Sequence, residues 1–116
     1  MQTKINSSAL TPHQQTITML HQLGIPVHRN GYQQLCIAVP RYAQDFAQSL
    51  SKELYPFVAA QSGQNNWNSV ERTIRDSILD AWNHRDPQVW ASYFPQQQKA
   101  PSNKLFISTL AEQIKL

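Results

Sequence analysis

The sequence predicts an all-α fold, a compact bundle of about six or seven short helices that contains a helix-turn-helix. Three observations lead to this prediction. Apolar residues recur at steps of three and four along most of the chain, which is the period of a helix. Prolines and glycines divide these runs into short segments. Neither an alternating apolar-polar run nor an Asn-Gly hairpin signal, which would indicate strands, is present.

The size and charge of the chain allow one domain and suggest little about its partner. The chain has 116 residues and a formal net charge of +3. That length is enough for one hydrophobic core. Residues 1–10 are polar and lack periodicity, so we expect a flexible N-terminal arm, followed by the folded domain at 11–116. The small positive excess suits an anionic partner without requiring one.

The first predicted helix runs from Thr11 to Gly24. Thr-Pro places proline at the first helical position, where its missing N–H costs nothing, and glycine is favoured just beyond a helix end. Residues 25–28 should form an extended link to the second helix, because a residue that precedes proline avoids the helical region.

The second predicted helix covers residues 31–39, where apolar residues again recur at steps of three and four. Pro40 should either end this helix or kink it. Helical spacing continues beyond it through four apolar residues, Tyr42, Phe46, Leu50 and Leu54. A further short helix should then begin at Pro56 and end at Ser62-Gly63.

The most regular helical pattern lies at residues 66–85. Its buried side should be an apolar stripe made of Val70, Ile74, Ile78, Ala81 and Trp82. Several asparagines near its start can cap it. Two shorter helices should follow, one opened by Asp86-Pro87 and one capped by Ser102, with the polar loop 95–101 between them.

A short helix, a glycine-containing turn and a longer helix with a polar outer face have the layout of a helix-turn-helix. The first helix would be residues 56–61, and the recognition helix would start near Trp67. Its outer face would carry the side chains that enter the major groove: Asn68, Glu71, Arg72 and Arg75. Either arginine can donate a bidentate pair of hydrogen bonds to guanine, and the glutamate can accept from cytosine. Polar helix faces are more often simply solvated, so spacing alone does not establish DNA binding.

Catalytic and metal-binding alternatives find little support in the sequence. The histidines are scattered, and there is no Cys/His cluster, HExxH motif or glycine-rich phosphate loop. Cys36 lies on an apolar helix face, where a buried small hydrophobe is expected rather than a nucleophile. We therefore expect no enzymatic activity, no cofactor and no metal. A lone cysteine, the lack of a signal-peptide pattern and the lack of a spanning apolar run favour a cytoplasmic location and no membrane partner.

Four segments of the chain resemble the C-terminal DNA-binding domain of stage zero sporulation protein A, the response regulator family that commits bacteria to sporulation. These segments are Leu23 to His28 with Gly31-Tyr32, Leu54-Tyr55-Pro56, Ser69 to Arg75 with Ala81-Trp82, and Pro101-Ser102-Asn103 with Phe106-Ile107. They occur in the family's order and at nearly its spacing, over roughly residues 15–115. The resemblance makes sequence-specific DNA binding the leading hypothesis.

The resemblance implies that Glu71, Arg72 and Arg75 face the bases of a DNA box with a TGTCGAA-like core. It also implies that three other residues lie near the DNA backbone or a neighbouring subunit: His28, Ser102 and Asn103. Family members bind such boxes as tandem dimers. They contact the RNA polymerase sigma subunit through surfaces outside the recognition helix.

Two positions of the recognition helix depart from the family pattern. Ser69 stands where an arginine is usual, and Asp76 stands where a histidine is usual. Because Glu71 and Asp76 offset Arg72 and Arg75, the presumed DNA face is close to neutral. Neutralisation of phosphates supplies much of the affinity for DNA, so weaker binding or altered specificity is expected. The main alternative is a protein-interaction module on the same fold that modulates a full-length regulator or RNA polymerase without strong DNA binding.

The family's phosphorylated receiver domain has no counterpart in this sequence, since residues 1–10 are too few to form one. Aspartyl-phosphate control is lost if the chain is the whole gene product. It lies on another part of the protein if the chain is an excised domain. The sequence leaves both alternatives open.

Overall fold

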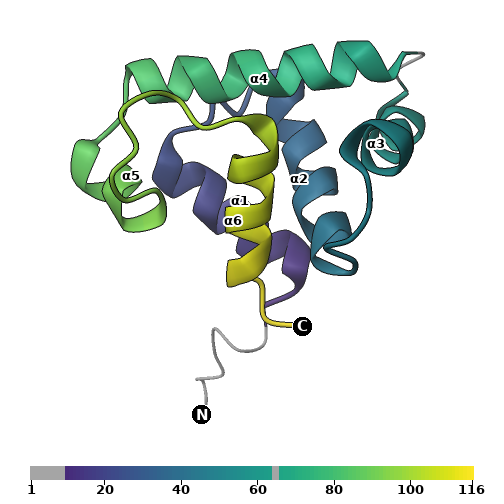
Figure 1. The fold of residues 1–116 in the computed structure, drawn as a ribbon, viewed down its shortest axis with the longest axis horizontal. Helices are drawn as coiled ribbons and strands as arrows, with labels where there is room; N and C mark the ends of the chain where they lie inside the picture. The colour runs from purple at the N-terminus through teal and green to yellow at the C-terminus, as the bar shows by residue number, and fades with distance from the viewer. Residues whose placement is uncertain (1–9, 64–65) are drawn as a thin grey trace.

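The computed structural model describes residues 10–63 and 66–116. The predicted arm therefore lies outside the described residues except for Leu10. Within the described parts the chain is helical and contains no strand, which confirms the all-α prediction (Figure 1). The elements in chain order are α1 (Pro12–Leu23), α2 (Asn30–Ala43), the π-helical segment η3 (Leu50–Leu54), α3 (Tyr55–Ser62), α4 (Trp67–Asn83), α5 (Pro87–Tyr93) and α6 (Asn103–Gln113).

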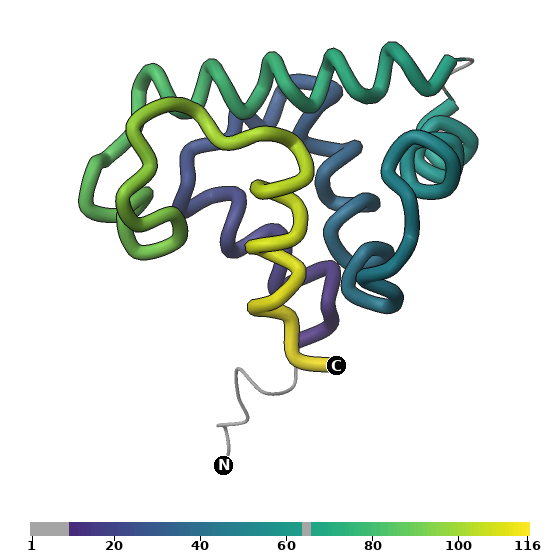
Figure 2. Tube along the Cα trace, in the orientation of Figure 1, coloured from purple at the N-terminus to yellow at the C-terminus, as the bar shows by residue number. Residues whose placement is uncertain are grey.

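The long helix α4 lies across the starts of two other helices (Figures 1 and 2). Both α2 and α6 begin next to α4, run away from it and pack against each other. Helix α1 packs on α2, α3 lies beside the first turns of α4, and η3 packs on α3 and α2. The molecule is thus a bundle of short helices capped at one end by α4, which leaves one side of α4 uncovered.

The hydrophobic core lies between these helices and contains the apolar stripe predicted for α4. All five residues of that stripe are 9% exposed or less. Trp90 of α5 packs edge-on against Trp82, and its indole N–H donates a hydrogen bond of 3.0 Å to the carbonyl oxygen of Leu23. This bond satisfies a buried donor while joining α5 to the end of α1. Cys36 is also part of the core, as predicted.

Local capping signals mark the helix ends as the sequence predicts. The Thr11 hydroxyl accepts from the Gln14 amide at the start of α1, and Gly24 ends that helix with a positive φ of 77°. Asn66 caps α4 by accepting from the Asn68 amide. Asp86 and Ser102 cap the two following helices in the same way. Each cap satisfies an amide that the helix leaves without an internal partner.

Two local predictions are wrong. Helix α2 does not end at Pro40 but continues to Ala43, and the helical spacing from Tyr42 to Leu54 is interrupted by a loop before the π-helical segment η3 begins at Leu50. Residues 44–49 form a loop in which Phe46 is 45% exposed. A side chain here takes a backbone hydrogen bond that a helix would otherwise form, since the Asp45 carboxylate accepts from the Ala47 amide at 2.9 Å.

The link at residues 25–28 is the second local error, because it is not extended throughout. The Arg29 amide donates to the Pro26 carbonyl at 3.2 Å, which closes a turn just before α2. Pro26 restricts only the residue that precedes it, so the residues that follow are free to form this turn, of which Pro26 is the first residue. Turn formation places His28 at the start of α2, close to α4.

Candidate nucleic-acid interface

Helices α3 and α4 form the predicted helix-turn-helix. Gly63 ends α3 with a φ of 77°, and Asn66 opens α4, with residues 64–65 outside the described part. The first residue of α4, Trp67, stacks on Tyr55 of α3 with ring centroids 6.2 Å apart and an interplanar angle of 11°. This aromatic contact fixes the start of the recognition helix against the first helix of the unit.

The predicted DNA-reading residues lie on α4 on the sides away from its apolar stripe. Four of them are exposed, namely Asn68, Arg72, Arg75 and Asp76, and two are half-buried, namely Ser69 and Glu71. Within the described residues, Arg72 makes no ion pair. Its guanidinium therefore has no partner among the described residues to give up before it meets an external acceptor.

The charges on this face largely cancel. Arg75 forms an ion pair of 3.7 Å with Glu71, one turn earlier on α4, and solvent reaches both side chains, which are 57% and 43% exposed. Such a pair is screened by water and contributes little stability. Asp76 balances Arg72, so the face carries two cations and two carboxylates. The near-neutral face predicted from the sequence is what the structure presents.

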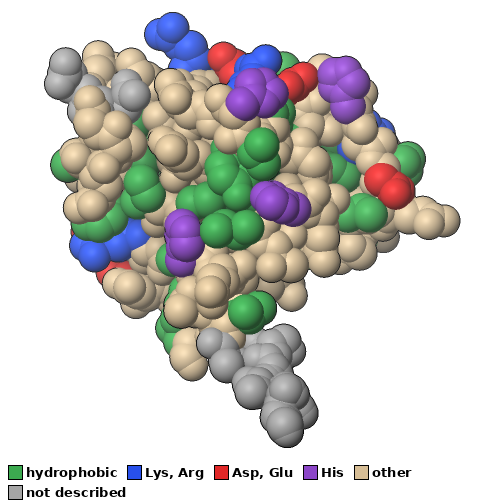
Figure 3. All heavy atoms as spheres, turned by 180° about the vertical axis from the view of Figure 1, so that it is seen from behind, with side chains coloured by type: hydrophobic (Ala, Val, Ile, Leu, Met, Phe, Trp, Pro, Cys, Tyr) green, Lys and Arg blue, Asp and Glu red, His purple; other side chains and the backbone are tan. Residues whose placement is uncertain are grey.

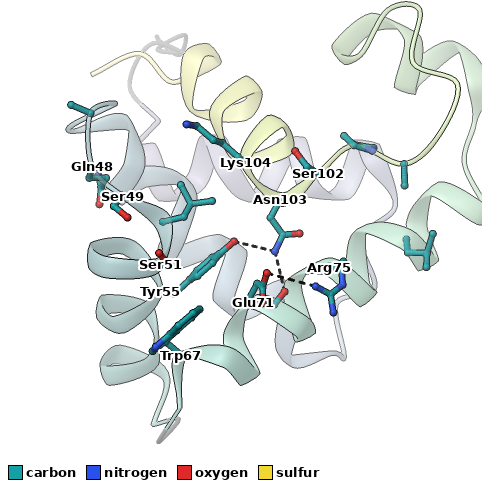
Figure 4. A pocket seen from close by; sticks show the side chains of 15 residues that line it. Gln48, Ser49, Ser51, Tyr55, Trp67, Glu71, Arg75, Ser102, Asn103 and Lys104 are labelled. Atoms are coloured by element: carbon teal, nitrogen blue, oxygen red, sulfur yellow. Dashed lines mark hydrogen bonds and ion pairs between the residues drawn. The ribbon is translucent and has the colours of Figure 1, made fainter.

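A groove of about 870 Å³ lies along one flank of α4, between the 47–51 segment, the start of α3 and the start of α6 (Figure 4). Arg75 and Lys104 supply positive charge to its lining. Hydroxyl groups come from three serines, Ser49, Ser51 and Ser102. Lys104 belongs to no recognisable motif, and the sequence shows only that it follows the Ser102 cap by two residues. Its role at the groove therefore appears only when α6 is placed beside α4.

Asn103 does not extend into solvent, although the resemblance places it near the DNA backbone. Its side-chain nitrogen Nδ2 donates to the Tyr55 hydroxyl at 3.1 Å and to the Glu71 carbonyl oxygen at 3.0 Å (Figure 4). Its Oδ1 is buried and has no partner in the described part of the chain. Burial raises the pKa of the Tyr55 hydroxyl, with the Asn103 hydrogen bond acting in the opposite direction. Tyr55 is therefore neutral at ordinary pH.

The other flank of α4 meets the turn before α2. His28 is exposed there and lines a hollow of about 340 Å³ together with Arg29, Asn30, Thr73, Asp76 and Ser77. Arg29 forms an ion pair of 3.7 Å with Asp80 of α4. His28 and Ser102 thus lie on opposite flanks of the recognition helix, each at the start of another helix. A helix start carries partial positive charge from its unpaired amides.

The face seen from behind has a different character (Figure 3). Apolar side chains gather in its middle with histidines beside them, and lysines and arginines lie toward its edges. A hollow of about 440 Å³ between α1 and α2 includes Ile17, Tyr32 and Cys36 in its lining. Burial raises the pKa of the Cys36 thiol to about 11. It is therefore a protonated thiol at neutral pH, which is the unreactive form.

Across residues 10–63 and 66–116, no group of three or more His, Cys, Asp or Glu residues is arranged to hold a metal ion. In the same stretches, no helix has the length and apolar character needed to cross a membrane.

Comparison with known families identifies the domain. Residues 16–114 match the family model described as "Sporulation initiation factor Spo0A C terminal". The chain belongs to this family. The Spo0A C-terminal domain is a DNA-binding effector domain in the regulation of sporulation transcription, and it is not a class of enzyme. The match confirms the resemblance drawn from the four segments and the general prediction of a DNA-binding regulator.

Proposed function

We propose that this domain reads a TGTCGAA-like DNA box in the major groove with α4. The observation that carries the proposal is the outward position of Arg72, exposed in the second turn of the recognition helix and without an ion pair among the described residues. Arginine is the side chain that most often reads guanine, through paired hydrogen bonds to O6 and N7. Membership of a DNA-binding family supports the same function.

The neighbouring side chains would have distinct tasks in base reading. Asn68 is exposed one turn before Arg72 and can form paired hydrogen bonds with adenine. Arg75 would have to exchange its ion pair with Glu71 for a base or a phosphate. The Glu71 carboxylate would then be available to accept from a cytosine amino group. Ser69 lies nearer the side of α4, where a hydroxyl can bond a phosphate.

The two flanks of α4 would meet the two phosphate backbones that border the major groove. On one flank, Ser102 and Lys104 lie at the start of α6, where amides and a cation favour an anion. On the other flank, His28 lies before α2, but Asp76 lines the same hollow and would repel phosphate. The first flank is therefore the stronger backbone contact. With only one flank well suited to phosphate, the domain should bind DNA more weakly than a domain with more cations on its recognition face.

We also propose that two copies bind tandem boxes and that a surface outside α4 contacts the RNA polymerase sigma subunit. Family membership supports both proposals. Tandem binding would raise the apparent affinity, because each copy holds its neighbour close to the second box. A cytoplasmic location would follow from these partners.

The test is fluorescence anisotropy of the domain with a duplex that carries two tandem boxes, beside a scrambled duplex, over a salt series. We expect tighter binding to the boxes, with a logarithm of affinity that falls linearly with the logarithm of salt concentration. Arg72→Ala should cost about 1–3 kcal/mol of discrimination at one base pair. Arg41→Ala is the matched control, because Arg41 stacks on Phe57 near the far end of α2. Equal discrimination by the Arg72 variant and the wild type would contradict the assignment.

A protein-interaction module is the second candidate function. The observation that favours it is the balance of charges on α4, with Arg75 already paired to Glu71. A domain of this kind would bind the box and the scrambled duplex with equal, weak affinity in the same assay. It would instead be captured by a full-length regulator of its family or by RNA polymerase, and Arg72→Ala would weaken that capture.

A further inference from the structure

One side-chain amide joins three helices beneath the groove. Asn103 is the first residue of α6, and its nitrogen bonds Tyr55 at the start of α3 and the backbone of Glu71 in α4 (Figure 4). The bond to α4 goes to a main-chain carbonyl oxygen. It therefore fixes the position of the recognition helix itself, whatever the Glu71 side chain does.

The side-chain amide nitrogen of Asn103 is fully used in joining these three helices. A side-chain amide nitrogen carries two protons, and both are used, one by each partner. Tyr55 is only 4% exposed, and its ring supports Trp67 at the first position of α4. The recognition helix is thus held at two points, its first residue through Tyr55 and its second turn directly through Asn103.

The groove opens between α4 and the start of α6, and within the described residues the Asn103–Glu71 bond is the side-chain hydrogen bond that links these two helices. On the α4 side of the groove lies Arg75, which we assign to a base or a phosphate, and on the other side lie Ser102 and Lys104, which we assign to a phosphate. One DNA duplex can contact Arg75 on α4 and the pair Ser102 and Lys104 on α6 at the same time only if the two helices are the right distance apart. The residue that sets this separation therefore controls whether base reading and backbone binding occur together.

We propose that Asn103 is a positioning residue for specific DNA recognition, acting through α4 and, by way of Tyr55, through Trp67. The inference rests on the proposed function. It assigns Asn103 a task other than a phosphate contact, and it makes the nearly buried Tyr55 a contributor to the specificity of DNA recognition. Loss of either bond leaves every cation of the interface in place.

The experiment measures the ratio of affinities for the tandem-box and scrambled duplexes, with its salt dependence, in Asn103→Ala and Tyr55→Phe. Two lost hydrogen bonds should lower the ratio about tenfold, and one should lower it roughly threefold. The affinity for the scrambled duplex and the salt slope should stay at the wild-type values, because no phosphate contact is removed. Tyr42→Phe is the matched control, since Tyr42 is 3% exposed and donates at 3.1 Å to the Phe46 carbonyl, away from α4.

Two results would overturn the proposal. A salt slope that falls by about one in Asn103→Ala, with equal weakening on both duplexes, would make Asn103 a phosphate contact. An unchanged ratio of the two affinities in Tyr55→Phe would show that the Asn103–Tyr55 hydrogen bond does not contribute to specificity. This variant also provides a test if Asn103→Ala does not fold.

A second experiment needs no DNA: residual dipolar couplings of the backbone amides would measure the angle between α4 and α6. We expect it to change in Asn103→Ala and to stay constant in Tyr42→Phe; an unchanged angle in Asn103→Ala would contradict the inference. If the wild-type domain bound both duplexes equally, the proposed function would be contradicted, but the role of Asn103 in positioning α4 would not. The couplings would then still decide whether Asn103 sets the position of the recognition helix.

Discussion

The recognition helix meets the starts of two helices, and the two junctions are built in opposite ways. At the start of α2, Gly31 lies so close to α4 that an added Cβ would be 2.0 Å from the Ser77 hydroxyl and 2.9 Å from the Thr73 carbonyl oxygen. At the start of α6, an open groove separates the helices, and the Asn103 amide bridges them. One flank of α4 is held by direct contact and the other by a directed hydrogen bond.

This difference separates stability from recognition. Close-packed surfaces resist any change in volume, so the α2 junction should dominate the free energy of unfolding. A hydrogen bond contributes only about 1 kcal/mol to stability but demands a direction and a distance. The α6 junction is therefore suited to setting geometry at an interface, at small cost to the fold when it is altered.

The largest expected effect is that of Gly31→Ala at the close-packed junction. Its Cβ would overlap Ser77 and the Thr73 backbone, so α2 and α4 would have to move apart. Overpacking of this kind costs about 1–3 kcal/mol, and we expect the upper part of that range because backbone is involved. Urea denaturation of both proteins measures the difference in the free energy of unfolding.

Gly24→Ala is the matched control for that substitution. No atom of the described residues lies within 4 Å of its added Cβ, but its φ of 77° disfavours a side chain, so the cost should be only about 1–2 kcal/mol. Ser77→Gly in the Gly31→Ala background should restore part of the lost stability. If Gly24→Ala proved more costly than Gly31→Ala, close packing at the α2 junction would not be the main source of stability.

Asn103→Ala should destabilise the domain by about 1–2 kcal/mol, less than Gly31→Ala. It removes two hydrogen bonds and leaves the partly buried Glu71 carbonyl with one donor fewer. Ser108→Ala is the control on the same helix, because the Ser108 hydroxyl donates at the surface to the nearby Leu105 carbonyl, within α6 itself. A loss in Asn103→Ala greater than that in Gly31→Ala would reverse the comparison between the junctions.

Alkaline pH offers a graded way to disturb the α6 junction. Burial raises the pKa of Tyr55 in the folded state, so its neutral form is favoured there. The unfolded chain begins to lose the tyrosine proton near pH 10, while the folded chain keeps it. This contribution to stability is therefore complete below about pH 10 and is lost as pH rises toward the folded value. Unfolding curves at several pH values should show a shallower loss in Tyr55→Phe, and equal slopes would contradict this.

Much of the fold could be predicted because its signals are local. The limits of α4 follow from Asn66 and from an apolar stripe with the period of a helix. The start of α6 follows from Ser102 in the same way. The loop around Phe46 could not be predicted from spacing, because polar side chains there bond the backbone and override a helical pattern. Local periodicity does not reveal such competition.

The candidate site was predictable only in part. The exposed positions of Arg72 and Asp76 follow from the helical period, since they lie opposite the buried stripe. The inward direction of Asn103 depends on Tyr55 and Glu71, which are 48 and 32 residues away in the sequence. A motif can place such a residue near a site, but only the packed helices decide which way it points.

The smallest expected effect on stability is that of Glu71→Gln, and it sharpens the contrast between fold and recognition. The ion pair with Arg75 is exposed, so its loss should change the free energy of unfolding by less than about 0.5 kcal/mol. DNA binding should respond much more, because the released Arg75 can meet a phosphate and the salt slope should steepen by about one. Asp76→Asn makes the same change of charge one turn away without releasing Arg75. If both variants bound all duplexes more tightly and kept the same preference for the box, Glu71 would act through its charge alone. A loss of preference in Glu71→Gln only would make its carboxylate a reader of cytosine.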